Sequence, residues 1–478
     1  MNIIGRKKEI SELLHYKNSK KSEFVALYGR RRVGKTVLVK ELFKGEFAFS
    51  HTGLSPYDEK RKVTRADQLE HFYHSLIEYG LEETSCPENW LQAFYMLEHL
   101  LQEKNDGGKQ LVFIDELPWM DANASGFVTA IEAFWNGWAS DKNIYLIVCG
   151  SATSWMLDNV INNTGGLYGR LSAELHLSPF TLCETEAFFE SNGIAYSHYD
   201  IAQAYMVLGG IPYYLEKFRK GRSLAQNIDN ILFSKQATLS GEFNRLIGSL
   251  FTNPEPYTSV IRLLSKRRYG YTREEISVHT GISSGSGLTK IIRALEAGEF
   301  IVRYVPFDAQ KREVLYRLTD PFCQTYLKLV DGRKSNDPNY WQNSQNLPTM
   351  SAWRGIAFEE LCMAHLPQIK NALGISGIET SVTTLTLRGD ETSRGTQVDL
   401  FIIRKDNVVN LCEIKFSNDE FEIDKAYDAV LRHRISAVSE RLKKTQNIHL
   451  TFITTFGIKQ NEYSGIVQRE ITLDALFG

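Results

Sequence analysis

The chain has 478 residues, of which 43% are apolar and 12% aromatic, and its formal net charge is −2. This composition is typical of a globular protein, and the length allows about two to four domains. The charge excludes binding of nucleic acid through an overall positive field. No apolar run approaches the roughly 20 residues of a membrane span, so we expect no membrane segment. Six scattered cysteines without a CxxC pair, and no apolar signal-peptide core, predict reduced thiols and a cytoplasmic location.

A strand-like run at 24–28 precedes a helical pattern from Val37, and the segment between them carries a phosphate-binding pattern. Gly29-Arg30-Arg31-Arg32-Val33-Gly34-Lys35-Thr36 fits G-x-x-x-x-G-K-[ST]. Backbone N–H groups of such a loop face phosphate oxygens, the lysine reaches the β- and γ-phosphates, and the threonine hydroxyl ligates Mg²⁺. The pattern predicts bound ATP and Mg²⁺, with nucleotide contacts from Gly29, Arg32, Val33, Gly34, Lys35, Thr36 and Val37. A glycine-rich turn without a ligand is the alternative.

Two later strands are predicted to end near the same loop. Leu111-Val112-Phe113-Ile114 leads into Asp115 and Glu116, so a buried strand ends in two carboxylates. Asp115 can hold Mg²⁺ through water, and Glu116 can act as the general base that polarises the attacking water. The run at 144–149 ends near Ser151, which either senses the γ-phosphate or is an ordinary turn residue.

Residues 1–178 alternate strands and helices, which predicts an α/β domain with a parallel sheet. Further strands are expected at 46–50 and 174–178. Residues 179–255 have no strand-like run, and Thr181-Leu182-Cys183-Glu184 has the spacing of a capping box. We interpret this second segment as a helical lid on the first.

Residues 256–330 predict a winged helix-turn-helix. Apolar periodicity indicates three helices, whose caps and breaks are Thr272 with Glu275, Gly281, Ser283 or Ser284, and Gly298. Strand-like runs at 300–305 and 314–318, with a turn near 308–310, then form a hairpin.

The 256–320 segment is locally basic, with eleven Lys/Arg against seven Asp/Glu. This local balance of +4 makes DNA a candidate partner, contacted by Lys266-Arg267-Arg268, Lys290 and Arg293. The alternative is a solvated helix face in a module that binds no DNA.

Residues 331–350 are polar and rich in Asn and Ser, which predicts a linker or a poorly ordered loop. The remaining domain, 351–478, begins with a helix. Its strands are expected near 382–387, 397–403, 408–416 and 448–454.

A second chemical site is predicted in this last domain. Glu413 and Lys415 share one strand face because side chains alternate, and a short hairpin would bring Asp399 beside Glu413. Carboxylates that hold Mg²⁺ and a lysine that orients water are what metal-dependent phosphodiester hydrolysis needs. Glu359, on the helix that precedes these strands, can complete the metal site. A plain Glu413–Lys415 salt bridge is the alternative.

These motifs together resemble the prokaryotic, archaeal-type AAA+/STAND-related ATPase family, which has a P-loop ATPase, a winged helix and a C-terminal PD-(D/E)XK nuclease-like domain. The resemblance spans nearly the whole chain. Besides the loop at 29–36, it rests on Gly5-Arg6-Lys7-Lys8-Glu9, Asp115-Glu116-Leu117-Pro118-Trp119, Gly150-Ser151, Leu167-Tyr168-Gly169-Arg170-Leu171, Gly209-Gly210-Ile211-Pro212-Tyr213-Tyr214-Leu215 and Leu318-Thr319-Asp320-Pro321-Phe322.

The resemblance implies further roles. Arg6 would lie near the adenine, Arg170 would be an arginine finger for a neighbouring subunit, and Pro212 would contact nucleotide from the lid. A surface arginine and a helix-breaking turn are the alternatives for the last two. The four positions of the nuclease signature would be Glu359, Asp399, Glu413 and Lys415, with Val398 where the superfamily has its proline.

Two functions follow. The first is an ATP-hydrolysing enzyme that acts on DNA through the winged helix and a metal-dependent nuclease site, with a second copy of the chain as a candidate partner in a homo-oligomer. The second is a regulatory switch, in which ATP or ADP sets the lid position and the C-terminal domain is not catalytic.

Overall fold

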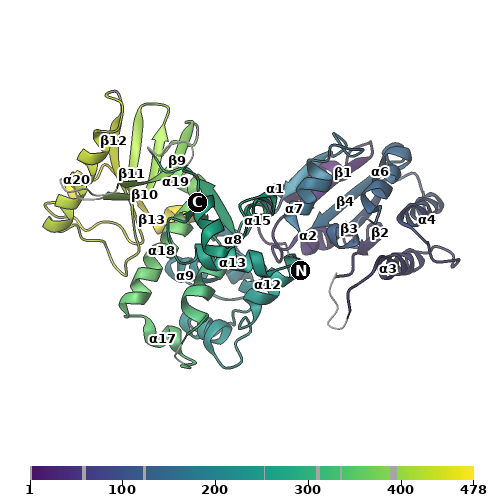
Figure 1. Cartoon of the computed structure of the whole chain (residues 1–478), viewed down its shortest axis with the longest axis horizontal. Coiled ribbons are helices and arrows are strands. Elements are labelled where there is room, and N and C mark those ends of the chain that lie inside the picture. The colour runs from purple at the N-terminus through teal and green to yellow at the C-terminus, as the bar shows by residue number, and fades with distance from the viewer. Residues whose placement is uncertain are drawn as a thin grey trace. The chain divides into compact units, whose positions relative to one another are not determined.

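The computed structural model describes residues 3–55, 61–121, 125–251, 253–307, 313–333, 336–387 and 396–478. Two compact units make up the chain, residues 1–179 and 180–478 (Figure 1). The division falls within one residue of the boundary predicted between the α/β domain and the lid. No helix in the described ranges is long and apolar enough to cross a bilayer.

The first unit is built on a parallel five-stranded sheet in the order β2-β3-β4-β1-β5. Its strands are β1 (Glu23–Tyr28), β2 (Phe47–Thr52), β3 (Gln110–Asp115), β4 (Ile144–Gly150) and β5 (Ala173–His176). All five strands expected from the sequence are confirmed. Each of the three central strands is an apolar run whose side chains are buried on both faces, as a parallel sheet requires.

Helices cover both faces of this sheet. They are α1 (Lys7–Lys17), α2 (Lys35–Leu42), α3 (Arg65–Glu78), α4 (Trp90–Glu103), α5 (Leu117–Met120), α6 (Phe127–Gly137) and α7 (Thr153–Met156), with the 3-10 helix η1 (Ala139–Asp141) and the short π-helix η2 (Leu157–Ile161). The core of one face joins aromatic side chains of α3, α4 and α6, such as Phe72, Trp90 and Phe134, to alternate residues of the strands.

The second unit begins with the helices predicted as a lid: α8 (Leu182–Ser191), α9 (His198–Leu208), α10 (Pro212–Leu215), α11 (Leu224–Ile228), η3 (Asp229–Phe233) and α12 (Glu242–Leu250). The predicted capping box is present, because Thr181 accepts from the Glu184 backbone and Glu184 accepts from that of Thr181. Every residue of α9 from Ile201 to Leu208 is buried. This helix is therefore the centre of the unit.

The next segment contains α13 (Glu255–Leu264), β6 (Tyr271–Thr272), α14 (Arg273–Thr280), α15 (Ser286–Ala297), β7 (Ile301–Tyr304) and β8 (Leu315–Leu318). The strands form an antiparallel sheet in the order β6-β8-β7. Thr272 caps α14 as predicted, with Glu275 completing the box. The turn expected near 308–310 lies outside the described residues.

The predicted start of the third helix at Ser283 or Ser284 is wrong. Helix α15 begins at Ser286, after an N-cap at Gly285. The reason is a tertiary contact, since the guanidinium of Arg273 donates to the carbonyls of Ser284 and Gly285 and holds this stretch as a turn.

The predicted linker at 331–350 is also wrong for residues 336–350. After α16 (Pro321–Thr325) and η4 (Tyr326–Val330), the chain forms α17 (Tyr340–Ser344). Trp341 of α17 is 1% exposed and packs edge-on to Trp353. Its backbone N–H donates to the buried Asp229 carboxylate at 2.7 Å. The polar residues of this stretch surround one buried indole, which composition alone does not reveal.

The C-terminal part has a five-stranded mixed sheet in the order β13-β12-β11-β10-β9. Its elements are α18 (Pro348–Ala364), α19 (Leu366–Ala372), β9 (Thr380–Leu387), β10 (Thr396–Arg404), β11 (Val408–Lys415), α20 (Lys425–Ser439), β12 (Asn447–Thr454), η5 (Ser464–Ile466), β13 (Arg469–Thr472) and η6 (Leu473–Phe477). The four expected strands are present. The sequence missed β13, because it is short and only Ile471 in it is buried.

Replacing Trp341 with Ala should destabilise the second unit by about 3–5 kcal/mol, because a fully buried indole leaves a cavity. Urea unfolding followed by circular dichroism measures the loss. Tyr95→Ala is the control, since Tyr95 is 63% exposed and should change stability little. An unfolding midpoint in Trp341→Ala equal to that of the wild type would show that 336–350 is dispensable to the fold.

Candidate functional site

The loop between β1 and α2 requires glycine at two positions. Gly29 has φ 140°, and a Cβ there would lie 2.4 Å from the Leu177 carbonyl oxygen. Gly34 has φ 94° and is the N-cap of α2. Both conformations are costly for any residue with a side chain. The tight loop therefore turns its backbone at the N-terminus of α2, where N–H groups without intrahelical partners suit an anion.

Two side chains of this loop are already placed for a nucleotide. Lys35 is 5% exposed, and its Nζ donates to the carbonyls of Gly29 and Arg30, both at 2.9 Å. The Thr36 hydroxyl donates to Asp115 Oδ2 at 2.7 Å. Hydroxyl and carboxylate oxygens are ligands that Mg²⁺ takes. The adjoining oxygens of Thr36 and Asp115 therefore fit the predicted ion.

The sheet register brings the remaining predicted residues to this loop. Strand β4 lies between β1 and β3, with Tyr28 opposite Gly150 and Ile114 opposite Val148. The carboxyl ends of the three strands consequently meet at one edge. Gly29, Asp115 and Ser151 each stand at or just beyond such an end.

Glu116 and Ser151 form a pair that the sequence did not predict. The Ser151 hydroxyl donates to Glu116 Oε2 at 2.8 Å, and the Ser151 N–H donates to the same oxygen at 3.1 Å. Burial raises the pKa of Glu116, while the nearby Lys35 lowers it. Glu116 itself has φ 48°, a left-handed conformation that is uncommon for glutamate. The carboxylate predicted to be the base is thus held by the residue predicted to be the sensor.

The other residues predicted for the nucleotide site differ in exposure. Arg6 is 5% exposed and donates through Nη2 to the Val33 carbonyl at 3.2 Å, so it supports the loop directly. Arg32 has a left-handed φ of 72°. Val37 is 53% exposed on α2. The proximity of Arg6 to adenine stays a prediction.

Arg170 is exposed and follows a loop that is tied to α6. The Glu132 carboxylate accepts from the Gly166 N–H at 3.1 Å and from the Asn163 amide at 3.2 Å. Asn136 also donates to the Gly166 carbonyl at 2.8 Å. These anchors position the segment that presents Arg170, and no sequence motif indicated them. Pro212 begins α10 in the second unit, and its contact with nucleotide stays a prediction.

The hairpin predicted in the C-terminal domain is present. Strands β10 and β11 pair antiparallel with Leu400 opposite Cys412, a register that places Asp399 opposite Glu413. A β-bulge interrupts the pairing of β10 with β9 between Val398 and Phe401, at the position of Asp399. Bulges re-aim side chains, often near functional sites.

Arginines neutralise the carboxylates of this second site. Arg268, which follows α13, forms ion pairs with Glu359 of α18 and, at 2.8 Å, with Asp399. Glu413 is 1% exposed and pairs with Arg434 of α20. It also accepts from the Tyr427 hydroxyl at 2.8 Å, whereas Lys415 Nζ lies 3.6 Å away. Burial lowers the pKa of Lys415, and Asp399 opposes this shift.

These residues have the ligand types that Mg²⁺ prefers, and in this structure their carboxylates are paired with arginines. Within the part of the chain that the structure describes, no group of three or more His, Cys, Asp or Glu could hold a metal ion. The site is instead an ion-pair network. Sequence reasoning missed Arg268 and Arg434 here, because they are distant in the chain from the signature.

One family model matches the N-terminal part of the chain, which contains this site. Residues 3–218 match the family model of an ATPase domain predominantly from Archaea. This part of the chain is therefore similar to an archaeal-type ATPase domain. An uncharacterised protein of Methanocaldococcus jannaschii is 24% identical over 333 residues, 69% of each chain.

Two solved structures are also similar to the chain. A Walker-type ATPase of Pyrococcus abyssi is 17% identical, with 68% of this chain and 96% of that chain covered and a TM-score of 0.47. The ORC2 protein of Aeropyrum pernix, in ADPNP–ADP complexes, is 12% identical, with 68% and 93% covered and a TM-score of 0.42.

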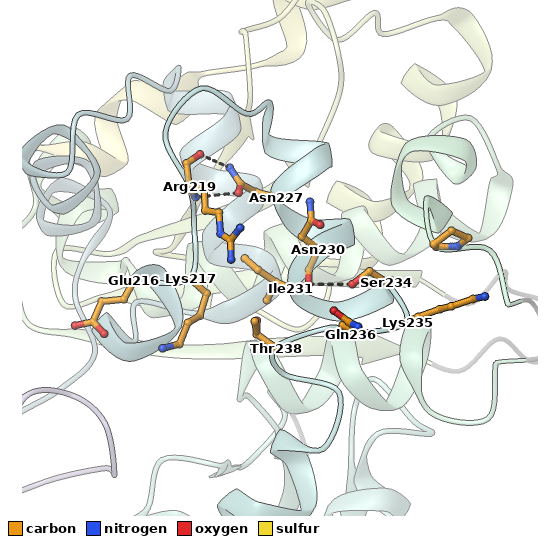
Figure 2. A pocket seen from close by; sticks show the side chains of 11 residues that line it. Glu216, Lys217, Arg219, Asn227, Asn230, Ile231, Ser234, Lys235, Gln236 and Thr238 are labelled. Atoms are coloured by element: carbon orange, nitrogen blue, oxygen red, sulfur yellow. Dashed lines mark hydrogen bonds between the residues drawn. The ribbon is translucent and has the colours of Figure 1, made fainter.

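A cavity of about 550 Å³ lies in the second unit, where it is lined by residues that follow α10 and by residues of α11 and η3 (Figure 2). Lys217, Arg219 and Lys235 stand at its wall. Its buried polar side chain, Asn227, is bonded to both backbone groups of Arg219 and to the Tyr196 hydroxyl. The cavity contains no residue predicted for either chemical site.

Replacing Gly29 with Ala should weaken ATP binding by the ATPase domain at least about tenfold, because the new Cβ would push the loop from the Leu177 carbonyl. Titration calorimetry with ATP and Mg²⁺ measures the affinity. Gly45→Ala is the matched control, since Gly45 also has a positive φ of 81° but open space around its Cβ. Equal affinities in the two variants would contradict the requirement for glycine at 29.

Proposed function

We propose that the chain is a Mg²⁺-dependent ATP-hydrolysing AAA+/STAND-like ATPase that acts on DNA through a winged helix at 256–330 and a nuclease-like domain at 351–478. The observation that carries the hydrolytic part is the prearranged pair of contacts at the sheet edge. Thr36 is bonded to Asp115, and Glu116 is bonded to Ser151. Both pairs lie next to the 29–36 loop, which has the phosphate-binding pattern.

Each residue then has a chemical role. Backbone N–H groups of 29–36 bind the phosphates, and Lys35 exchanges its two carbonyl acceptors for phosphate oxygens. Thr36 and Asp115 would hold Mg²⁺, which would supply positive charge to the phosphates. Glu116 accepts a proton from the attacking water at its carboxylate, a role that its raised pKa favours. Ser151 keeps that carboxylate oriented.

The proposal extends to a second copy of the chain. Arg170 is exposed, and Tyr168, two residues before it, is 77% exposed on the same anchored loop. An arginine that reaches a neighbouring subunit would stabilise charge during phosphoryl transfer there. Pro212 would report the nucleotide state from the lid.

The support for DNA is the arrangement of α13–α15 with the β6-β8-β7 sheet, together with the local positive balance. Lys290 and Arg293 are exposed on α15. The other predicted contacts are partly engaged elsewhere, since Arg267 pairs with Glu275 at 2.8 Å and Arg268 pairs with Glu359 and Asp399. The DNA-binding face would therefore centre on α15.

A nucleotide-controlled switch is the second candidate function, and a specific observation favours it. All three carboxylates of the nuclease signature pair with arginines of the chain itself. In addition, Tyr199 of α9 stacks on Phe416 and Phe456, so aromatic contacts join the lid to the C-terminal domain. A lid that moved with nucleotide state would carry the C-terminal domain with it.

Glu116→Gln should keep ATP binding but lower kcat by about a hundredfold or more, because the amide cannot take up the proton. Lys35→Ala should lose ATP binding. Phosphate release and calorimetric titration separate the two effects. Glu103→Gln, on the exposed end of α4, is the control and should leave both unchanged. Normal turnover in Glu116→Gln would assign the base to another residue.

A nuclease assay distinguishes the two candidate functions. With Mn²⁺ or Mg²⁺ and ATP, the enzyme hypothesis expects cleavage of DNA that is lost in Lys415→Ala while ATP hydrolysis is kept. Lys405→Ala is the control, because Lys405 lies in an exposed surface pair with Glu379. If wild type and both variants leave DNA and RNA intact, the switch is the better description.

A further inference from the structure

Arg268 lies in a turn whose shape is set independently of the carboxylates that it contacts. The turn, residues 265–270, joins α13 to β6. Gly270 has φ 76°, and a Cβ there would lie 1.9 Å from the Tyr316 carbonyl oxygen. The Tyr304 hydroxyl donates to the Tyr269 carbonyl at 2.8 Å, and the Gly270 N–H donates to the Arg267 carbonyl at 3.0 Å. The turn is therefore fastened to the β6-β8-β7 sheet.

This fastening directs two adjacent arginines to different partners. Arg267 stays within its own segment, where it pairs with Glu275 and lies 4.1 Å from the centre of the Tyr271 ring. Arg268 leaves the segment and pairs with Glu359 and Asp399, which belong to the C-terminal domain. The two arginines therefore form a natural pair of test and control positions.

The single guanidinium of Arg268 forms ion pairs with both carboxylates. The Glu359 and Asp399 side chains are 15% and 10% exposed, and that of Arg268 is 26% exposed. A cation between two carboxylates that are largely removed from water compensates the charge of both. Glu413 takes its own cation from Arg434. With Lys415, the site holds three carboxylates and three cationic groups, so it is balanced without an external ion.

We propose that Arg268 is an autoinhibitory latch: while the 265–270 turn is seated, its guanidinium occupies the Glu359 and Asp399 carboxylates and excludes a divalent cation from them. Withdrawal of the turn frees both carboxylates for the ion. This inference rests on the proposed nuclease-like role of the C-terminal domain. It makes the predicted winged helix the element that controls access to that site.

Mn²⁺ binding to the nucleotide-free full-length chain tests the latch, measured by titration calorimetry and by electron paramagnetic resonance of free Mn²⁺. Arg268→Gln should bind one more Mn²⁺ than the wild type, or bind it at least tenfold more tightly. Arg267→Gln should behave as the wild type. The gain should disappear in the double variant Arg268→Gln with Asp399→Asn, which assigns it to this site.

Arg268→Lys is a second test in case the glutamine variant does not fold. Lysine keeps a positive charge but lacks the planar guanidinium that spans two carboxylates. Its Mn²⁺ affinity should lie between those of the wild type and Arg268→Gln. A far-ultraviolet circular dichroism spectrum equal to that of the wild type in the Arg268 and Arg267 variants shows that the fold is intact. Equal Mn²⁺ binding by the wild type, Arg268→Gln and Arg268→Lys, with or without a second ion, would overturn the latch.

The same variants separate the latch from the nuclease proposal. If Arg268→Gln gains Mn²⁺ but cuts neither DNA nor RNA, the latch stands and the nuclease activity fails. If the wild type cuts DNA as fast as Arg268→Gln does, the nuclease activity stands and the latch fails.

Discussion

The parallel pairing of β1, β4 and β3 is the constraint on which the nucleotide site depends. Because all three strands run in one direction and their ends are in register, the glycine loop, Ser151 and the Asp115–Glu116 pair meet at one edge of the sheet. The insertion of β4 between the other two strands places Ser151 within hydrogen-bonding distance of Glu116. Strands that are buried on both faces cannot slip in register without exposing apolar side chains, so this geometry is held by the core itself.

The second unit contains three carboxylates that are largely buried close to one another. Its C-terminal sheet gathers Glu359, Asp399 and Glu413, and each side chain is at most 15% exposed. Buried carboxylates need partners, and the partners are arginines from α20 and from the turn after α13. The acidic site is thereby linked to the segment predicted as a winged helix. A movement of that segment would therefore change the charge pairing of the acidic site.

The predictions from sequence are correct for features that residues close together in the chain define by themselves. The capping boxes at Thr181 and Thr272 need only a side chain and a backbone N–H three residues apart. The β10–β11 hairpin follows from a short turn, so the register that opposes Asp399 and Glu413 was predictable. The two wrong predictions depend on contacts between residues farther apart. Arg273 donates to the Ser284 carbonyl, so α15 begins later than predicted. Trp341 is buried, so the polar segment around it is folded rather than a linker.

The sequence by itself determined the phosphate-binding loop, the acidic strand end and the positions of the second acidic site. Those features depend on residue types at fixed spacing, and spacing is a property of the chain. Only the tertiary structure decided how the groups are paired. Glu116 rests on Ser151, and Glu359 and Asp399 share Arg268, because packing brings together residues separated by 35, 91 and 131 positions. Charge pairing between such distant residues leaves no periodicity or motif, so it becomes visible only once the core has folded.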